Sequence, residues 1–345
     1  MTQGQMDIES WMGDIRRRID GILERFFESK CEEATRLSPQ AIELVTEVRK
    51  LTMRGGKRLR PIVTAAAYRA ASGATDLTPT FEVGAALELL QTYLLIHDDW
   101  MDEDNERRGG PAVHYAFQEK HGDRHLGASL GILAGDLAST FGWELLLSAN
   151  FPEARRDEGL ALFVRIQKEV FAGQQLDLMT DGDIELMHDL KTGSYTTRGP
   201  AELGGILANA DTAGIQSLRH WAAPLGVAFQ LRDDLLGTFG NVQQTGKPGD
   251  DLRHGKHNAV VAAFRRLGAS EAERAVLEGV WGRADATDEE VCAATAVLSA
   301  ARHEVGTRLC FLADRSRAAL AASPFDDGAK YVLEEVTRRL TDRGS

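Results

Sequence analysis

The chain has 345 residues, of which 43% are hydrophobic, and a formal net charge of −12. Such a chain can bury a large core, and no linker or shift in composition interrupts it, so we expect one domain over residues 1–345. The acidity argues against a nucleic-acid partner, because proteins that bind a phosphate backbone usually present a basic face. The N-terminus carries Asp7, Glu9 and Asp14, and no uncharged apolar run approaches the ~18 residues of a membrane span. Together with three sparse cysteines, these features predict a soluble, cytoplasmic protein.

Helical patterning dominates the sequence, and the alternating patterns of strands are essentially absent. Thr78-Pro79 precedes an Ala- and Leu-rich helix over 82–97. Further helices are expected, in chain order, over 127–147, 158–179, 184–197, 201–209 and 215–239, followed after Lys256 by three or four amphipathic helices that include 287–309 and 327–340. Several of these are apolar on nearly every side, as central helices of a bundle are. The prediction is an all-α bundle with a central cavity.

An acidic cluster, Asp98-Asp99-Trp100-Met101-Asp102, follows the apolar run Leu94-Leu95-Ile96. Residues i and i+4 share one face of a helix, so Asp98 and Asp102 can direct two carboxylates at one point. Carboxylates at the end of an apolar segment are unfavourable unless a cation binds there. Mg²⁺ takes oxygen ligands, typically one or two carboxylates with waters and substrate phosphates. The cluster therefore predicts a magnesium site.

A second cluster, Asp233-Asp234, follows the apolar residues Val227 to Phe229. One Asp-Asp pair taken singly is more often a solvated acidic helix end. Here both pairs follow apolar runs, and cations that could neutralise phosphate recur along the chain. These cations are Lys57, Arg58, Arg60, Arg107, Arg108, Lys191, Lys247 and Lys256. If the two clusters face each other, they form a cage for a diphosphate.

Six motifs in series resemble those of the trans-isoprenyl diphosphate synthases, in particular the short-chain, geranylgeranyl diphosphate synthase-like branch. In chain order they are Gly55-Gly56-Lys57-Arg58-Leu59-Arg60-Pro61, the D-D-x-x-D run with Arg107-Arg108-Gly109, Gly173-Gln174-Gln175-Leu176-Asp177, Lys191-Thr192, Gln230 to Asp234, and Gly246 to Lys256. The resemblance implies a helical bundle of the isoprenoid synthase type, a homodimer, and a transferase of the EC 2.5.1 type. Its reaction is head-to-tail condensation of isopentenyl diphosphate with an allylic diphosphate by Mg²⁺-assisted ionisation, condensation and elimination.

The resemblance also assigns the metal site. Asp98 and Asp102 would bind two Mg²⁺ ions and Asp233 a third, while Asp99 and Asp234 would support them or pair with Arg and Lys. Gln174 and Asp177 would support the metal end.

The same resemblance assigns the two diphosphates and the cation. The allylic diphosphate would be held by Arg107, Lys191 and Lys256, with Lys247 close by. Isopentenyl diphosphate would be held by Lys57, Arg60 and Arg108, with Gln91. Lys191, Thr192 and Gln230 would place oxygen atoms or dipoles near the allylic cation, and the departing diphosphate would take the proton.

Two features depart from the family pattern. Gly237 stands where many relatives carry a third Asp, so Asp233 would hold metal less tightly. The stretch Lys247-Pro248-Gly249-Asp250-Asp251 is about one residue tighter than the common form, which leaves the placement of Asp250 and Asp251 open.

The length of the prenyl product is predicted from Tyr93 and Leu94. These residues precede Asp98 by roughly 6 to 7.5 Å along the helix axis, at ~1.5 Å per residue. Tyr93 without an insertion in the cluster resembles the pattern associated with a C20 product, whereas an aromatic pair is typical of C15. A C15 or longer product therefore remains an alternative. So does a class I terpene cyclase, which needs no isopentenyl site, and a non-catalytic regulatory subunit, which usually loses acids of the first cluster.

Overall fold

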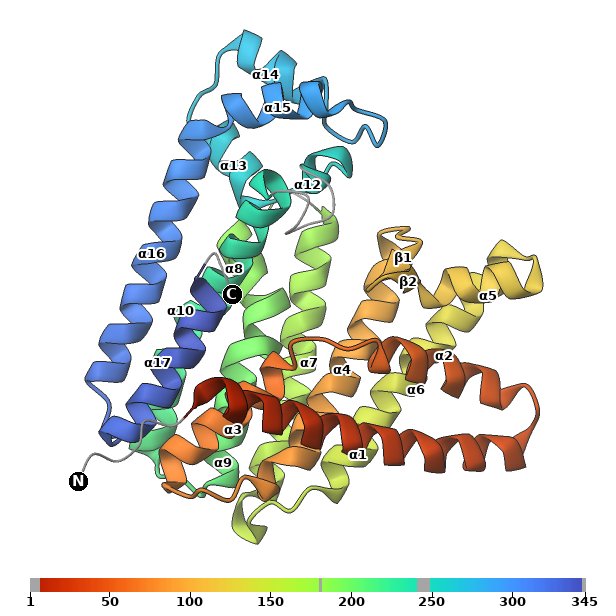
Figure 1. The fold of residues 1–345 in the computed structure, drawn as a ribbon, viewed down its shortest axis with the longest axis vertical. Coiled ribbons are helices and arrows are strands. Elements are labelled where there is room, and N and C mark those ends of the chain that lie inside the picture. Colours follow the sequence, from red (N-terminus) through yellow and green to blue (C-terminus); the bar gives the residue numbers. More distant parts are fainter. Residues whose placement is uncertain (1–6, 180–181, 241–248, 343–345) are drawn as a thin grey trace. The chain divides into compact units, whose positions relative to one another are not determined.

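The computed structural model describes residues 7–179, 182–240 and 249–342 (Figure 1). Within these ranges the regular secondary structure is helical apart from an antiparallel hairpin of β1 (Glu106–Arg107) and β2 (Gly110–Pro111), which confirms the predicted all-α class. The chain divides into two compact units, one of residues 1–162 and 200–211 and the other of residues 163–199 and 212–345. Whether the whole chain folds as one domain stays a prediction.

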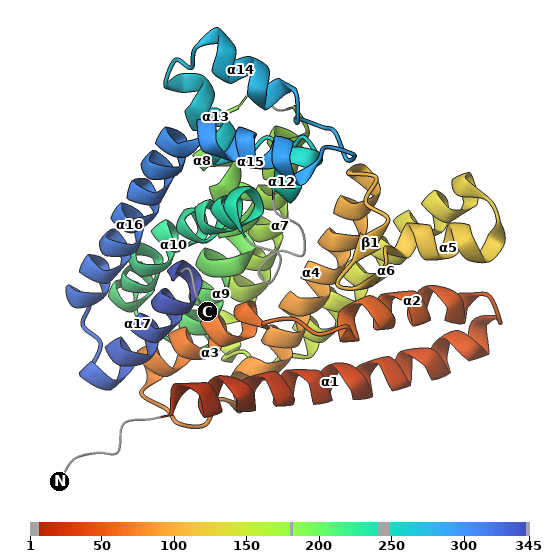
Figure 2. The ribbon, with the colours of Figure 1, turned by 45° about the horizontal axis from the view of Figure 1, so that its top comes forward.

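The first unit contains the N-terminal helices and the hairpin. Its helices are α1 (Ile8–Leu37), α2 (Ala41–Met53), α3 (Leu59–Ser72), η1 (Thr78–Thr80), α4 (Phe81–Met101), α5 (Val113–His121), α6 (Arg124–Ser148) and η2 (Glu153–Arg155). It also holds the start of α7 (Arg156–Met179) and nearly all of α9 (Gly199–Leu207). Figure 2 shows α1 and α2 lying side by side.

Helix α4 forms the centre of the first unit and positions the first acidic cluster. Every residue from Val83 to Leu90 is buried. A Cβ on Gly84 would lie 2.9 Å from Ile19 of α1 and 3.0 Å from Pro61 of α3, so the glycine permits close packing of three helices. At the end of α4, the backbone N–H of Asp102 donates to the carbonyl of Asp98 at 2.8 Å. The two carboxylates are thus one helical turn apart on the same face.

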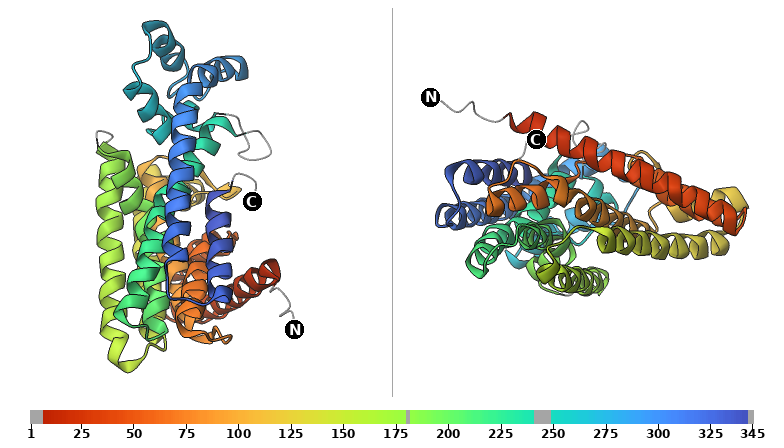
Figure 3. Two further views of the ribbon diagram at one scale, coloured as in Figure 1. Left: turned by 90° about the vertical axis from the view of Figure 1, so that its left-hand side faces the viewer. Right: turned by 90° about the horizontal axis from the view of Figure 1, so that it is seen from below.

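The second unit contains the second acidic cluster. Besides most of α7, its helices are α8 (Ile184–His188), the π-helix η3 (Asp189–Arg198), α10 (Thr212–Phe239), α12 (Asp250–Arg253), α13 (Ala259–Arg266), α14 (Glu271–Glu278), α15 (Asp288–Val297), α16 (Ser299–Ala321) and α17 (Asp327–Thr341). Figure 3 shows α16 and α17 side by side, and both pack against α10. An apolar cluster from α10, α13, α15 and α16 forms the core.

Two predicted helices differ from those observed. The segment 184–197 is not one α-helix: after His188 it continues as the π-helix η3, because hydrophobic spacing does not distinguish an α-helix from a π-helix. The segment 287–309 is two helices that meet at Leu298. Leu298 is fully buried between the buried Ala294 and Ala301, so the bend keeps both apolar faces on one core.

One helix of the described chain, α6, is long and apolar enough to cross a membrane by length and composition. Of its most apolar 18-residue window, 44% is buried in the protein, and core helices of soluble proteins meet the same criterion. The absence of a membrane span therefore stays a prediction.

Candidate functional site

The residues predicted to form the site are divided between the two units, and each half is described by itself. In the first unit they come from the loop between α2 and α3, from α4, and from the β1–β2 hairpin. In the second they come from α7, η3, α10 and the segment that precedes α13. Lys247 lies outside the described residues.

The acids at the end of α4 have different environments. Asp98 is half-buried and Asp102 exposed, whereas Asp99 is fully buried. Arg107 donates from Nε to Oδ1 of Asp99 at 2.5 Å. Burial raises the pKa of Asp99 to about 6, although Arg107 favours its charged form. Asp99 thus pairs with arginine inside the protein, while Asp98 and Asp102 are the acids that solvent reaches.

Arg107 is also a neighbour of further arginine side chains. Arg108 donates from Nη1 to the carbonyl of Gly55 at 2.7 Å. Burial lowers the pKa of Arg108, and so do the neighbouring guanidiniums of Arg58, Arg60 and Arg107, whereas Glu88 raises it. Carboxylates balance Arg58 and Arg107, but the net effect of these groups still lowers the pKa of Arg108, so an additional anion beside Arg108 would be favourable. Arginine forks bind phosphate oxygens in pairs, so the cluster is suited to a diphosphate.

The structure brings together two of the residues predicted to bind isopentenyl diphosphate. Arg60 Nη1 donates to Oε1 of Gln91 at 2.6 Å, which joins α3 to α4. Lys57 is exposed on the loop before α3, where its carbonyl accepts from Arg16 at 3.3 Å. Lys57 is thus accessible to solvent, whereas Arg60 is 6% exposed and held against α4.

The prediction that Arg58 neutralises phosphate is wrong. Its side chain is 3% exposed and donates to Glu88 at 2.7 Å, to Asp20 at 2.9 Å and to the carbonyl of Thr52 at 3.0 Å. Its φ of +48° is in the left-handed region, where few side chains are favourable. Arg58 thus anchors the loop that carries Lys57.

Arg54 is a positioning residue that sequence analysis missed. It donates from Nη1 to the carbonyls of Arg107 at 3.1 Å and Pro111 at 2.7 Å, which ties the end of α2 to the hairpin. A Cβ on Gly110 would lie 2.7 Å from Cζ of Arg54, so only glycine leaves room for it. The sequence feature that could have indicated this role is the position of Arg54 directly before Gly55-Gly56.

In the second unit a hydrogen-bonded chain links three of the predicted residues. Thr192 donates from Oγ1 to Oε1 of Gln230 at 3.0 Å, and Gln230 donates from Nε2 to Oδ1 of Asp234 at 3.0 Å. The other oxygen of Asp234 accepts from the backbone N–H of Ala259 at 2.8 Å. Burial raises the pKa of Asp234 to about 6, although the hydrogen bonds from Ala259 and Gln230 lower it. Asp234 therefore organises the site from inside, and the half-buried Asp233 is the neighbour closer to solvent.

Lys191 pairs with Asp177 across the same unit. Its Nζ lies 2.5 Å from Oδ2 of Asp177. A Cβ on Gly173 would collide with the backbone of Lys191, so this glycine lets α7 and η3 approach. Nε2 of Gln174 is buried and has no hydrogen-bond partner among the described residues. A support of the metal end by Gln174 and Asp177 remains a prediction.

The structure gives a reason for Gly237. A Cβ at this position would collide with the carboxylate of Asp251. Asp251 is held there by Nδ2 of Asn258, which donates to Oδ2 at 3.0 Å, and burial raises the pKa of Asp251. A carboxylate from α12 thus fills the space that a side chain at position 237 would occupy. Lys256, a few residues on, is exposed.

The candidate chain-length residues lie in the middle of α4. Tyr93 and Leu94 are both half-buried. The Tyr93 ring meets the His97 ring edge-on, with 4.8 Å between centroids. Burial, and secondly the charge of Asp136 on α6, raise the pKa of Tyr93. Tyr93 thus lies on the part of α4 near α6.

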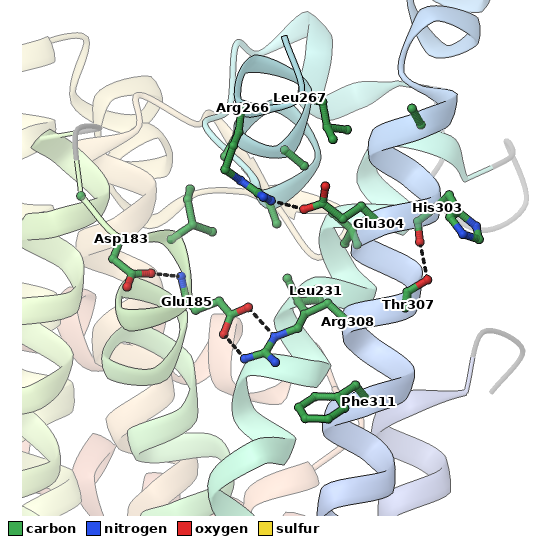
Figure 4. Close-up of a pocket in the computed structure, with 17 residues that line it drawn as sticks. Asp183, Glu185, Leu231, Arg266, Leu267, His303, Glu304, Thr307, Arg308 and Phe311 are labelled. Carbon is green, nitrogen blue, oxygen red and sulfur yellow. Dashed lines mark hydrogen bonds and ion pairs between the residues drawn. The ribbon is translucent and has the colours of Figure 1, made fainter. Parts of the chain in front are cut away.

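A cavity of ≈ 1190 Å³ lies in the second unit, among α8, α10, α13 and α16 (Figure 4). Its walls combine Ile184, Leu231 and Phe311 with ion pairs that include Glu185–Arg308. None of the predicted site residues lines it. It is therefore separate from the candidate site.

The acids fit Mg²⁺ by their chemistry. In the part of the chain that the structure describes, no three His, Cys, Asp or Glu side chains gather closely enough to hold a metal ion by themselves. Mg²⁺ commonly binds through one or two carboxylates and completes its shell with waters and substrate phosphates. Asp98 and Asp102, one turn apart, and Asp233 provide such partial sites.

Comparison with known proteins agrees with this geometry. The family profile described as polyprenyl synthetase matches residues 42–298. The short chain isoprenyl diphosphate synthase of Methanocaldococcus jannaschii is 30% identical over 263 residues, which are 74% of this chain and 76% of that protein. The farnesyl diphosphate synthase of Geobacillus stearothermophilus is 31% identical over 271 residues, 73% of this chain and 83% of that protein.

A solved structure is similar over nearly the whole chain. It is the geranylgeranyl pyrophosphate synthase from Corynebacterium glutamicum, complexed with isoprenyl diphosphate and magnesium. The TM-score is 0.87 and the sequence identity 29%, with 98% of this chain and 100% of that chain covered. This similarity confirms the predicted bundle of the isoprenoid synthase type.

Proposed function

Because this chain belongs to the polyprenyl synthetase family and is a trans-prenyltransferase, we propose that it condenses isopentenyl diphosphate with an allylic diphosphate and yields mainly geranylgeranyl diphosphate (C20). The observation that carries the substrate assignment is the arginine cluster beside the acids of α4. We assign Lys57, Arg60 and Arg108 to an anion site, and its neighbour Arg107 pairs with Asp99 beside the carboxylate pair. A terpene cyclase needs no such second diphosphate site, and a non-catalytic subunit needs no intact acid pair.

We assign three Mg²⁺ ions to the active site, two on Asp98 and Asp102 and one on Asp233. The bound ions supply electrostatic stabilisation of the departing diphosphate. The support is the oxygen-only donor set and the magnesium in the solved C. glutamicum relative. Asp99 contributes by holding Arg107 beside the pair.

The remaining side chains bind and orient the substrates. Arg107, Lys191 and Lys256 are assigned to the allylic diphosphate, with Lys247 in the same role. The Gln230 carboxamide presents its oxygen on the side of Thr192, as an electronegative group for the allylic cation should. The departing diphosphate accepts the proton, so no protein base is invoked.

The C20 product is assigned from Tyr93 as the floor of the chain pocket. A half-buried aromatic five residues before Asp98 supports this assignment. Relatives named for farnesyl and for geranylgeranyl products have similar sequence identity to this chain, so C15 or a longer product is the alternative.

We also propose a homodimer in the cytoplasm. The support for the dimer is α6, where Leu126, Ile132, Leu133 and Leu147 are exposed, Leu133 by 51%. Apolar side chains gathered on the exposed face of one helix commonly mark an association surface. Leu133→Asp should shift the mass measured by light scattering from dimer to monomer, and an unchanged mass would remove α6 from the interface.

Product analysis tests the function directly. Purified protein is supplied with Mg²⁺, isopentenyl diphosphate and one allylic primer at a time, and the products are separated by chain length. We expect C20 chains, no product in EDTA, and recovery on adding Mg²⁺. Cyclic hydrocarbons without elongation would establish the cyclase alternative, and activity that persists in chelator would contradict the metal assignment.

A further inference from the structure

His188, the last residue of α8, is buried beside the second acidic cluster. His188 is 2% exposed, and its Nε2 lies 3.3 Å from Oδ2 of Asp234. Nδ1 is also buried and has no hydrogen-bond partner among the residues that the structure describes. None of the six motifs named in the sequence analysis includes this histidine.

The surroundings of His188 select one form of its imidazole. Burial lowers the pKa of His188 to about 4, so the ring is neutral near pH 7. A neutral ring carries a single proton, on Nδ1 or on Nε2. Among the described residues a proton on Nδ1 would find no acceptor, and a buried donor without an acceptor costs ~1–3 kcal/mol. The proton therefore resides on Nε2, the nitrogen that lies 3.3 Å from Oδ2 of Asp234.

Helix α8 is held firmly enough to keep His188 in place. At its N-terminus, Asp183 accepts from the backbone N–H of Glu185 at 2.9 Å. The Glu185 carboxylate accepts two hydrogen bonds from Arg308 of α16, both 2.7 Å long (Figure 4). Paired bonds of this kind fix direction as well as distance. The helix is thus tied to α16 on one side while His188 meets α10 on the other.

The consequence extends from Asp234 to Gln230. With Oδ2 engaged by His188 and Ala259, Oδ1 of Asp234 is directed at Nε2 of Gln230. The carboxamide of Gln230 must then turn its oxygen to the opposite side, where Oγ1 of Thr192 donates to it. The orientation of the amide is therefore set by the direction of the carboxylate.

We propose that His188 is a positioning residue that, through Asp234, keeps the oxygen of the Gln230 carboxamide on the side of Thr192. The inference rests on the proposed function, in which that oxygen stabilises the allylic cation. Without the His188 donor, the backbone N–H of Ala259 is the one remaining donor to Oδ2 among the described residues, and Asp234 can rotate about χ2. The Gln230 amide can then flip, and its NH₂ group disfavours a cation.

Two substitutions separate the donor from the volume that it fills. His188→Leu fills the space without a donor, and His188→Gln returns an amide N–H at about the reach of Nε2. We expect His188→Leu to lower kcat about tenfold while KM for both diphosphates changes less than twofold, and His188→Gln to recover most of the loss. Should the leucine variant not fold, His188→Asn, whose nitrogen has the reach of Nδ1, replaces it.

A double substitution tests the route through Gln230. In a Gln230→Ala background, His188→Leu should lower kcat no further, because the group that it orients is gone. The structural control is Met187→Ala, which leaves a cavity at the buried residue next to His188. It should lower the melting temperature and leave kcat unchanged. Equal losses of kcat from His188→Leu with and without Gln230 would overturn the proposal, as would an unchanged kcat in the single variant.

A measurement without substrate keeps this proposal distinct from the proposed function. Nitrogen NMR of histidine-labelled protein should show His188 protonated on Nε2 only, and its signal should change in Asp234→Asn. Protonation on Nδ1 would overturn the proposal even in an active enzyme. If the protein transfers no prenyl group, the proposed function fails, while the tautomer still reports on the His188–Asp234 contact.

Discussion

Gly193 of η3 and Gly226 of α10 lie in direct contact. A Cβ on Gly226 would collide with Cα of Gly193 and lie 3.0 Å from Oγ1 of Thr197. The approach of the two backbones lets Thr192 reach Gln230 on the same pair of helices. Two residues without side chains thus position two residues whose side chains are assigned to the allylic cation.

Gly226→Ala should therefore lower both stability and turnover. Forcing a methyl group into a packed contact typically destabilises a protein by ~1–3 kcal/mol, and the separation of η3 from α10 should lengthen the Thr192–Gln230 hydrogen bond. Denaturant unfolding and kcat are measured together. The control is Gly21→Ala in α1, where a Cβ would lie 3.5 Å from only the flexible end of Arg25, so the better helix propensity should stabilise by up to ~1 kcal/mol. A stable, fully active Gly226→Ala variant would contradict the contact.

Asp98→Ala and Asp102→Ala should each lower turnover by several orders of magnitude, since each removes a proposed Mg²⁺ ligand. Loss of one electrostatic donor in other enzymes reduces kcat ~10²–10³-fold. Mg²⁺ titration should also show weaker binding. Glu103→Ala removes a neighbouring exposed acid whose partner is the exposed Arg124, and should leave kcat within twofold. Turnover within tenfold of the parent in either Asp variant would exclude the metal assignment.

Lys57→Ala and Arg108→Ala should raise KM for isopentenyl diphosphate more than KM for the allylic primer, because these cations are assigned to the isopentenyl phosphates. Steady-state kinetics with each substrate varied in turn checks this. Equal effects on both KM values would show that the two diphosphate sites are assigned wrongly.

Arg58→Ala is the matched contrast, because Arg58 is adjacent to Lys57 yet buried against Glu88. Removing one partner of a buried ion pair is expected to destabilise the fold by ~3–5 kcal/mol. Thermal unfolding should therefore report a large loss for Arg58→Ala and a small one for Lys57→Ala. A melting temperature close to the parent's in the Arg58 variant would contradict its anchoring role.

Tyr93→Ala should lengthen the product. If Tyr93 forms the floor of the chain pocket, removing its ring opens space for about one further C5 unit, and the products should move from C20 toward C25. Mg²⁺ dependence should not change, because Tyr93 is more than one turn from Asp98. The alternative is that the ring only packs, in which case its loss would destabilise by up to ~3–5 kcal/mol without altering chain length. Product chromatography and thermal unfolding on one variant distinguish the two.

Because of Asp99, the stability of the metal-free protein should depend on pH. The pKa of Asp99 is about 6 in the folded protein, against an ordinary value of 3.8, so the folded state binds more protons between these values. The free energy of unfolding should therefore fall as pH rises from about 4 to 6, by up to roughly 3 kcal/mol. Asp99→Asn removes this contribution. Relative to the parent, the variant should gain stability over that window in chelator; a constant difference would contradict the raised pKa.

Local sequence determined the helical class and most of the candidate site. The spacing of apolar residues predicted α4 and α10, and the i, i+4 spacing placed Asp98 and Asp102 on one face, because both properties depend on residues within one or two turns. The sequence assigns Arg60 and Gln91 to the same ligand, isopentenyl diphosphate, but does not predict that the two side chains contact each other. The distance between them comes from the packing of α3 on α4.

Only the tertiary structure decided which polar residues are inside. Arg58 and Arg60 have the same charge and nearly the same position in the chain, but Arg58 pairs with Asp20 and Glu88, whereas Arg60 donates to Gln91. The space beside Gly237 is filled by Asp251 from another helix, and His188 is explained by Asp234, which lies 46 residues later in the numbering of the chain. Such contacts arise from elements distant in sequence, and hydrophobic periodicity carries no information about the residue that a side chain will meet.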